Sequence, residues 1–273
     1  MPRNERPIGI FDSGIGGLTV AVAIRRALPG ERLLYFGDTA HFPYGEKSAE
    51  AIKHYAIRIA NFLLDRSCKA VVIACNTASA HATSEVDLTA GERVPVFNVI
   101  DPIAEHVARH WKGRRVGVIG TKGTIGSRIY VRAIGRLAPS VKVRSLATPL
   151  LAPMIEEGFY KNAISRAVIR GYLEHRNLAG IEALVLGCTH YPLIRKEVEE
   201  VAGEKVAVLD PPTIVARHIE QQLTGLGLLH EADAPAGPDH FFLSDVSESF
   251  AKSAGRFFRH KLRVEELRLW EER

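Results

Sequence analysis

The stretch ALVLGCTHYPLI, residues 183–194, decides how this sequence is interpreted. A short apolar run ends at Gly187, and a thiol, a hydroxyl and an imidazole follow at Cys188, Thr189 and His190. A run of this length, rich in Leu and Val, is typical of a strand buried on both faces of a parallel sheet. Because open α/β sheets bind ligands at the carboxyl ends of their strands, these side chains are expected at a ligand-binding edge.

A second stretch, VVIACNTASA at residues 71–80, repeats this arrangement with Cys75 at the strand exit and Asn76 and Thr77 at the start of a helix. The free N–H groups of a helix start hold anions and lower the pKa of a thiol. A cysteine is often only a small buried packing residue. Two cysteines with the same kind of polar followers favour a functional role, whereas Cys68, which precedes its strand, is interpreted as packing.

Short apolar runs alternate with helix-length amphipathic stretches along the chain, which predicts an α/β fold with mainly parallel sheets. Strands are expected at residues 8–11, 33–36, 70–74, 94–99, 115–120, 141–146, 183–187, 206–209 and 240–243. The pattern over residues 48–66 predicts an amphipathic helix that begins at a serine cap.

Nine strands are more than one sheet easily holds, so we expect two α/β domains. The first comprises residues 1–98 completed by residues 211–273, and the second comprises residues 99–210. Asp-Pro sequences at 101–102 and 210–212 mark the boundaries. The chain would then cross twice between the domains and leave a cleft between them.

The composition narrows the class of protein. The 273 residues are 46% hydrophobic with a formal net charge of +5, as in ordinary globular enzymes. Basic residues are spread along the chain, so no nucleic-acid partner is expected. The densest basic run, RFFRHKLR at 256–263, is interpreted as solvated surface.

No signal segment and no membrane-spanning run of about 18 apolar residues is evident, which predicts a cytoplasmic protein without membrane contact.

The sequence suggests no metal site. The three cysteines lack the spacing of zinc ligands. His106 and His110 are four residues apart on an expected helix, but no third ligand accompanies them, so they are interpreted as part of a helix surface.

Asp12 follows the first expected strand in IGIFDSGIGGLTV, residues 8–20. This glycine-rich turn does not fit the dinucleotide pattern GxGxxG, because Thr19 occupies the third glycine position. Asp12 could cap the next helix, bind a cationic amine or relay a proton to a thiol, and two cysteines at strand exits favour a functional role. The Pro-Tyr-Gly turn at residues 43–45 would expose backbone N–H groups.

Five stretches taken together resemble the glutamate racemases of the aspartate/glutamate racemase family. They are, in order, IGIFDSGIGGLTV, YFGDTAHFPYGEKS, VVIACNTASA, GVIGTKGTI and ALVLGCTHYPLI, and they span residues 8–194. The resemblance implies two α/β domains with the active site between them. It also implies interconversion of L- and D-glutamate without a cofactor, which would supply D-glutamate for bacterial peptidoglycan.

The resemblance further implies residue roles. Cys75 and Cys188 match the two catalytic thiols, and Asp12 and His190 match their respective acid/base partners. The matching substrate-binding positions are Asp12, Ser13, Tyr44, Gly45, Asn76, Thr77, Thr121, Thr189 and His190. Glu156 in APMIEEG matches a further carboxylate of the cleft, with Glu157 adjacent to it.

Two thiols suit racemisation because one base cannot easily serve both faces of a near-planar intermediate, so one cysteine acts as thiolate base while the other acts as thiol acid. Three other interpretations stay open: an aspartate racemase, a hydrolase with Cys188 as nucleophile and His190 as base, and a two-domain amino-acid-binding protein. A homodimer is expected, as for many cytosolic enzymes.

Overall fold

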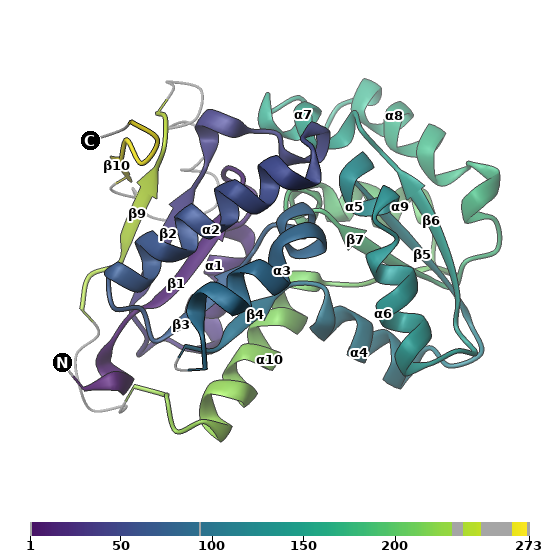
Figure 1. Cartoon of the computed structure of the whole chain (residues 1–273). Coiled ribbons are helices and arrows are strands. Elements are labelled where there is room, and N and C mark those ends of the chain that lie inside the picture. The colour runs from purple at the N-terminus through teal and green to yellow at the C-terminus, as the bar shows by residue number, and fades with distance from the viewer. Residues whose placement is uncertain (1, 93, 231–236, 247–263, 272–273) are drawn as a thin grey trace.

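Two parallel sheets form the framework of the protein (Figure 1). The computed structural model describes residues 2–92, 94–230, 237–246 and 264–271. The first sheet has the order β10-β9-β2-β1-β3-β4 and the second has the order β6-β5-β7-β8. All the pairings in both sheets are parallel.

The strands of the first sheet are β1 Ile8–Asp12, β2 Leu33–Gly37, β3 Ala70–Ile73, β4 Val96–Asn98, β9 His240–Leu243 and β10 Val264–Glu266. Those of the second sheet are β5 Arg115–Gly120, β6 Lys142–Ala147, β7 Ala183–Gly187 and β8 Ala207–Val208. The expected α/β fold with two mainly parallel sheets is confirmed. Each of the nine expected strands lies within two residues of its predicted bounds, whereas β10 was not expected.

The helices are α1 Leu18–Ala27, α2 Ala49–Asp65, α3 Asn76–Ala90, α4 Asp101–His110, α5 Lys122–Gly126, α6 Ile129–Leu137, α7 Leu151–Glu156, α8 Ala163–Leu173, α9 Arg195–Ala202 and α10 Pro211–Gly225. The predicted cap of α2 is present, because the Ser48 hydroxyl accepts from the Ala51 N–H at 3.3 Å. In the described part of the chain, no helix is long and apolar enough to cross a membrane. The basic run at 256–263 lies outside the described residues.

Helices cover both faces of both sheets, because alternate residues of the central strands β1, β3 and β7 point to opposite sides and are nearly all apolar. In β1, Ile8 and Ile10 join a cluster with α1, α4, α6 and α10, while Phe11 joins one with α2 and α3. The first cluster continues into the second sheet through Val116 and Val118 of β5. One core therefore joins the half of the molecule built on the first sheet to the half built on the second sheet, on the side of α4 and α10.

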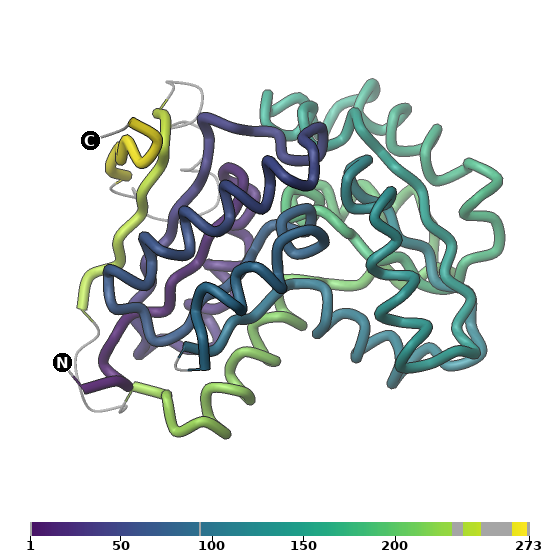
Figure 2. Tube along the Cα trace, in the orientation of Figure 1, coloured from purple at the N-terminus to yellow at the C-terminus, as the bar shows by residue number. Residues whose placement is uncertain are grey.

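The C-terminal part of the chain returns to the first sheet. Helix α10 packs against α1 and α4, β9 pairs with β2, and β10 pairs with β9. Figure 2 shows the segments that lead into α4 and α10 running between the two halves. The predicted boundaries near residues 98 and 210 stay a prediction. The strands within residues 8–98 and 240–266 share one sheet, and those within 115–208 form the other.

Candidate active site

Strands of both sheets end at one site. Strand β1 ends at Asp12, and Cys75 and Cys188 follow β3 and β7 closely. Two hydrogen bonds join these edges: Thr189 Oγ1 donates to Asp12 Oδ1 at 3.4 Å, and Thr19 Oγ1 donates to the Thr189 carbonyl at 3.0 Å. The sheet edges that the sequence singled out therefore face each other.

Cys75 is the N-cap of α3. Its Sγ accepts from the Ala78 N–H at 3.4 Å and donates to Ser13 Oγ at 3.6 Å. Burial, followed by the negative charge of Asp12, raises the pKa of Cys75 from an ordinary 9.0 to about 12. The expected effect of the helix start on this thiol is present. The helix N–H does lower the pKa of Cys75, but burial has the larger effect.

Asp12 is fully buried and organises the glycine-rich turn that follows it. Its Oδ2 accepts from the N–H groups of Gly14 and Gly17 at 3.1 and 3.0 Å, and Tyr35 OH donates to the Gly14 carbonyl at 2.8 Å. Burial raises the pKa of Asp12, while the positive charge of His190 and the two N–H donors partly oppose that rise. Asp12 thus fixes the turn and also acts electrostatically on Cys75.

His190 links Cys188 to a carboxylate. Its Nδ1 lies 3.7 Å from Cys188 Sγ, and its Nε2 lies 2.5 Å from Glu156 Oε1. Burial alone would lower the pKa of His190, but the contacts with Cys188 and Glu156 raise it well above its ordinary value. An imidazolium donates from both ring nitrogens, which satisfies both contacts. Glu156, at the end of α7, is half-buried against His190, whereas its neighbour Glu157 is exposed.

Polar side chains also join the halves beside the thiols. Thr77 Oγ1 lies 2.9 Å from Thr121 Oγ1 and 3.2 Å from Thr124 Oγ1, and Tyr130 OH donates to Asn76 Oδ1 at 2.6 Å. Thr124 and Tyr130 are absent from the predicted site. The sequence does point to Thr124, because it is the second threonine of GTKGT, residues 120–124, and Thr121 is the first. Tyr130 lies within α6, and nothing in the sequence distinguishes it.

Two glycines allow the halves to approach closely. A Cβ on Gly16 would lie 2.5 Å from both His190 Nδ1 and Thr189 Oγ1, and one on Gly45 would lie 2.7 Å from Thr121 Cβ. Real Cβ atoms do not approach other atoms this closely, so any larger residue would push the two sheet edges apart. Tyr44, beside Gly45, is buried.

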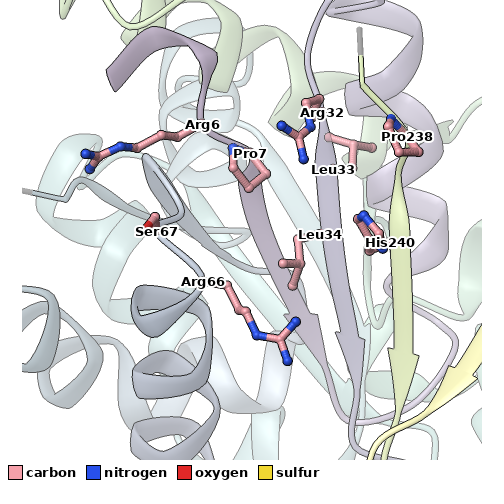
Figure 3. A pocket seen from close by; sticks show the side chains of 9 residues that line it. All are labelled: Arg6, Pro7, Arg32, Leu33, Leu34, Arg66, Ser67, Pro238 and His240. Carbon is pink, nitrogen blue, oxygen red and sulfur yellow. The ribbon is translucent and has the colours of Figure 1, made fainter. Parts of the chain in front are cut away.

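Two described cavities lie away from Cys75 and Cys188. One of about 340 Å³ lies where β1, β2 and β9 begin, the end opposite to Asp12, and Figure 3 shows Arg6, Arg32 and Arg66 around it. The other, of about 650 Å³, is lined by α3 and α6, with Ser79 and Arg132 among its residues. Neither of these two cavities contains Cys75 or Cys188 in its lining.

Cys68 packs beneath the first sheet, where a Cβ on Gly9 would lie 2.9 Å from its Sγ. His106 and His110 have ring centroids 4.3 Å apart on α4, and His110 Nδ1 contacts the His106 carbonyl at 2.9 Å. Across the described ranges, no group of three or more His, Cys, Asp or Glu side chains is arranged to hold a metal ion.

Comparison with known proteins shows the class to which this fold and site belong, that of an amino-acid racemase. The family model for Asp/Glu/hydantoin racemases matches residues 18–219, and the chain belongs to that family. It is 45% identical over 257 residues, 94% of each chain, to the glutamate racemase of Geobacter metallireducens. The Enterococcus faecalis glutamate racemase is 38% identical over 251 residues, which are 92% of this chain and 91% of that one.

Solved structures give the same result. The glutamate racemase of Francisella tularensis in complex with D-glutamate superposes with a TM-score of 0.90 at 36% identity, covering 98% of this chain and 99% of that one. The glutamate racemase of Thermus thermophilus superposes with a TM-score of 0.85 at 38% identity, covering 97% of each chain.

Proposed function

We propose that this protein interconverts L- and D-glutamate without a cofactor, by proton transfer at Cα between the substrate and two cysteines, Cys75 and Cys188. The observation that carries the proposal is the placement of the two thiols. They lie at the ends of strands in different sheets, and each contacts its own polar partners. The glutamate racemases named above, among them one in complex with D-glutamate, support glutamate as the substrate.

The proposed chemistry removes the α-proton on one face and returns a proton on the other. One sulfur accepts the proton as a thiolate, and the opposite thiol donates its proton to the carbanion, so the two sulfurs exchange protonation states in each turnover. Burial and the charge of Asp12 raise the pKa of Cys75, which favours its protonated thiol, whereas Cys188 Sγ lies 3.7 Å from Nδ1 of His190. Asp12 and His190 are the acid/base partners that adjust protonation on their respective sides.

The remaining site residues are proposed to bind substrate. Side-chain donors and acceptors come from Ser13, Asn76, Thr77, Thr121 and Thr189, and the Tyr44–Gly45 turn contributes its backbone. The N-terminal N–H groups of α3 suit a substrate carboxylate, and Glu156 and Asp12 suit its ammonium group. Fixed hydrogen bonds in a buried site, with water excluded, would stabilise the carbanion.

The proposal extends to the setting of the enzyme. D-Glutamate produced by this reaction would supply bacterial peptidoglycan, and we place the enzyme in the cytoplasm as a homodimer. Sedimentation equilibrium of the purified protein tests the dimer directly: a mass of twice 30.0 kDa supports it and a mass of 30.0 kDa contradicts it.

Circular dichroism of L-glutamate mixed with the purified protein, with no cofactor added, tests the function. The proposal predicts that the signal decays to zero as the two enantiomers equilibrate. A constant signal combined with measurable glutamate binding would indicate a binding protein instead. Faster decay with L-aspartate would indicate an aspartate racemase, and a covalent acyl group trapped on Cys188 would indicate the hydrolase that the Cys188–His190 contact also suits.

A further inference from the structure

Asp38 is a buried carboxylate for which the proposed racemisation has no role. It follows Gly37 at the carboxyl end of β2, and its N–H donates to the Asp12 carbonyl at 2.9 Å. Its side chain is fully buried. Burial of a carboxylate is unfavourable unless hydrogen-bond donors surround it. The origin of its donors therefore indicates what this residue does.

The donors to Asp38 come from three separate parts of the chain. Tyr44 OH donates to Oδ2 at 2.6 Å, and Ser244 Oγ and Trp270 Nε1 each donate to Oδ1 at 2.8 Å. His41 Nδ1 lies 3.0 Å from Oδ2. Ser244 follows β9 and Trp270 follows β10, so this one carboxylate joins the loop after β2 to both C-terminal strands.

The loop that Asp38 holds also contacts the second sheet's half of the molecule. The Phe42 ring lies 5.7 Å from the His190 ring, and Glu46 forms an ion pair with Lys122 at 3.3 Å. With the close approach of Gly45 to Thr121, these contacts make residues 42–46 one wall of the site. A displacement of this loop would move that wall relative to both sheet edges.

Contacts with His41 in the loop after β2 and with Tyr55 and Arg58 on α2 fix Trp270 in place. Its ring meets those of His41 and Tyr55 edge to face, with centroids 4.5 and 5.3 Å away, and the Arg58 guanidinium lies 5.5 Å from its centroid. These contacts hold the indole N–H toward Asp38, although the two residues are 232 positions apart.

We propose that Asp38 is a positioning residue for the racemisation and that Trp270 completes its set of donors, so that the C-terminal segment helps to set the substrate-binding loop. This inference rests on the proposed function, because it assigns the Tyr44–Gly45 turn to the substrate. Asp38 touches no reacting atom and acts through Tyr44. Burial, followed by the charge of Asp38, raises the pKa of Tyr44 well above its ordinary value, so Tyr44 remains a donor.

Steady-state kinetics of Asp38→Asn and Trp270→Phe test the proposal. Asp38→Asn keeps the side-chain volume but turns an NH2 group toward existing donors, so KM for glutamate should rise roughly tenfold, the expected effect of losing hydrogen bonds to a charged group. Turnover should fall less than about threefold, because the thiols keep their partners. Trp270→Phe removes only one N–H donor and should raise KM roughly threefold.

The chain has two tryptophans, so Trp111→Phe, at the end of α4 in the other half, is the matched control and should keep the wild-type KM. A thermal unfolding midpoint for each variant shows that it is folded, and Trp270→Phe decides the question if Asp38→Asn does not fold. Because Asp38 acts through Tyr44, Asp38→Asn should add less than about twofold to KM in a Tyr44→Phe background.

Two results would overturn the proposal: a KM within about twofold of wild type in both Asp38→Asn and Trp270→Phe, or an equal effect of Asp38→Asn with and without the Tyr44 hydroxyl. The same experiment separates this inference from the proposed function. If the wild-type protein does not racemise glutamate, the proposed function is contradicted. If the wild-type protein is active and the variants are unaffected, only the proposed role of Asp38 is contradicted.

Discussion

Cys75 and Cys188 have almost the same burial but opposite electrostatic surroundings. Their exposed fractions are 5% and 6%, and each follows a buried parallel strand. The charge that acts most strongly on Cys75 is the carboxylate of Asp12, which disfavours a thiolate. Cys188 Sγ instead lies 3.7 Å from Nδ1 of His190, whose pKa is raised by its contacts with Cys188 and Glu156. The two sulfurs are therefore almost equally buried but have different charged neighbours, a carboxylate at Cys75 and an imidazole of raised pKa at Cys188.

Because burial and Asp12 raise the pKa of Cys75, we expect the reaction to begin with Cys75 as the acid and therefore with Cys188 as the base. The opposite direction requires one proton to move from the Cys75 side to the Cys188 side. Since two enantiomers have equal free energies, kcat/KM must be the same for L- and D-glutamate. The asymmetry between the halves can therefore appear only in kcat and KM taken separately, and we expect kcat to differ between the two enantiomers.

Removing either thiol should have the largest effect. Cys75→Ser and Cys188→Ser should each lower racemisation roughly 10⁴-fold, the upper end for loss of a general acid or base, because each turnover needs both sulfurs. Cys68→Ala is the control, since Cys68 only packs against Gly9, and it should retain turnover. Chiral chromatography of the products measures all three variants. Near-normal turnover in either serine variant would contradict the two-base mechanism.

Alkylation by iodoacetamide as a function of pH compares the two sulfurs in the absence of substrate. Because the pKa of Cys75 is raised from 9.0 to about 12, its thiolate fraction near neutral pH should be roughly 10³-fold below that of an ordinary thiol. Its alkylation rate should rise up to about pH 12, while Cys188, whose Sγ contacts Nδ1 of His190, should react faster at neutral pH.

Cys68, whose pKa burial also raises to about 12, is an internal control for slow alkylation. Mass spectrometry distinguishes the three sites, since Lys69 separates the tryptic peptides of Cys68 and Cys75. Equal rates and equal pH profiles at Cys75 and Cys188 would contradict the difference between the two halves.

Glu156→Gln should act mainly on the Cys188 side, through the contact of Glu156 with His190. Glu156 raises the pKa of His190, so its neutralisation lowers that pKa, and the imidazolium is then lost at a lower pH as the pH rises. We expect a roughly tenfold lower kcat and an alkaline limb of the pH–rate profile shifted toward acid. Glu157→Gln, an exposed neighbour, is the matched control. A wild-type profile for Glu156→Gln would show that the carboxylate does not act on His190.

We expect the smallest effect from a substitution that removes hydroxyl contacts between the two halves of the molecule. Thr124→Val keeps the shape of a buried side chain but removes contacts with Thr77 and Thr121, so the free energy of unfolding should fall by about 1 kcal/mol. Urea unfolding measures this, with Thr89→Val as control because Thr89 Oγ1 donates only within α3, to the Glu85 carbonyl. A larger loss in the control would show that the Thr124 contacts do not stabilise the joined halves.

Local patterns predicted most of the framework and both thiols. Apolar runs and turn residues are properties of neighbouring positions, so strands such as β1 and β7 and the cap Ser48 could be recognised. Strand β10 has three residues and half-exposed or exposed side chains, so it carries no apolar pattern. The contact of Asp38 with Trp270 joins positions far apart in the chain, and only the folded sheet brings them together.

The sequence also does not show which of two adjacent residues in a short helix faces inward. Glu156 and Glu157 lie at the end of α7, which has six residues, too few for a pattern to show which carboxylate faces inward. Asp38 did have a signal, because it follows a buried strand as Asp12 does. The resemblance, however, assigns Asp38 no role.

The central claim, that the two sulfurs serve opposite faces of Cα, is tested most directly by racemisation in heavy water. At early times, L-glutamate should give D-glutamate fully labelled with deuterium at Cα, while the remaining L-glutamate stays unlabelled. The reaction begun from D-glutamate should give the mirror result. Label appearing equally in substrate and product, or a product that retains its original proton, would contradict the two-base account.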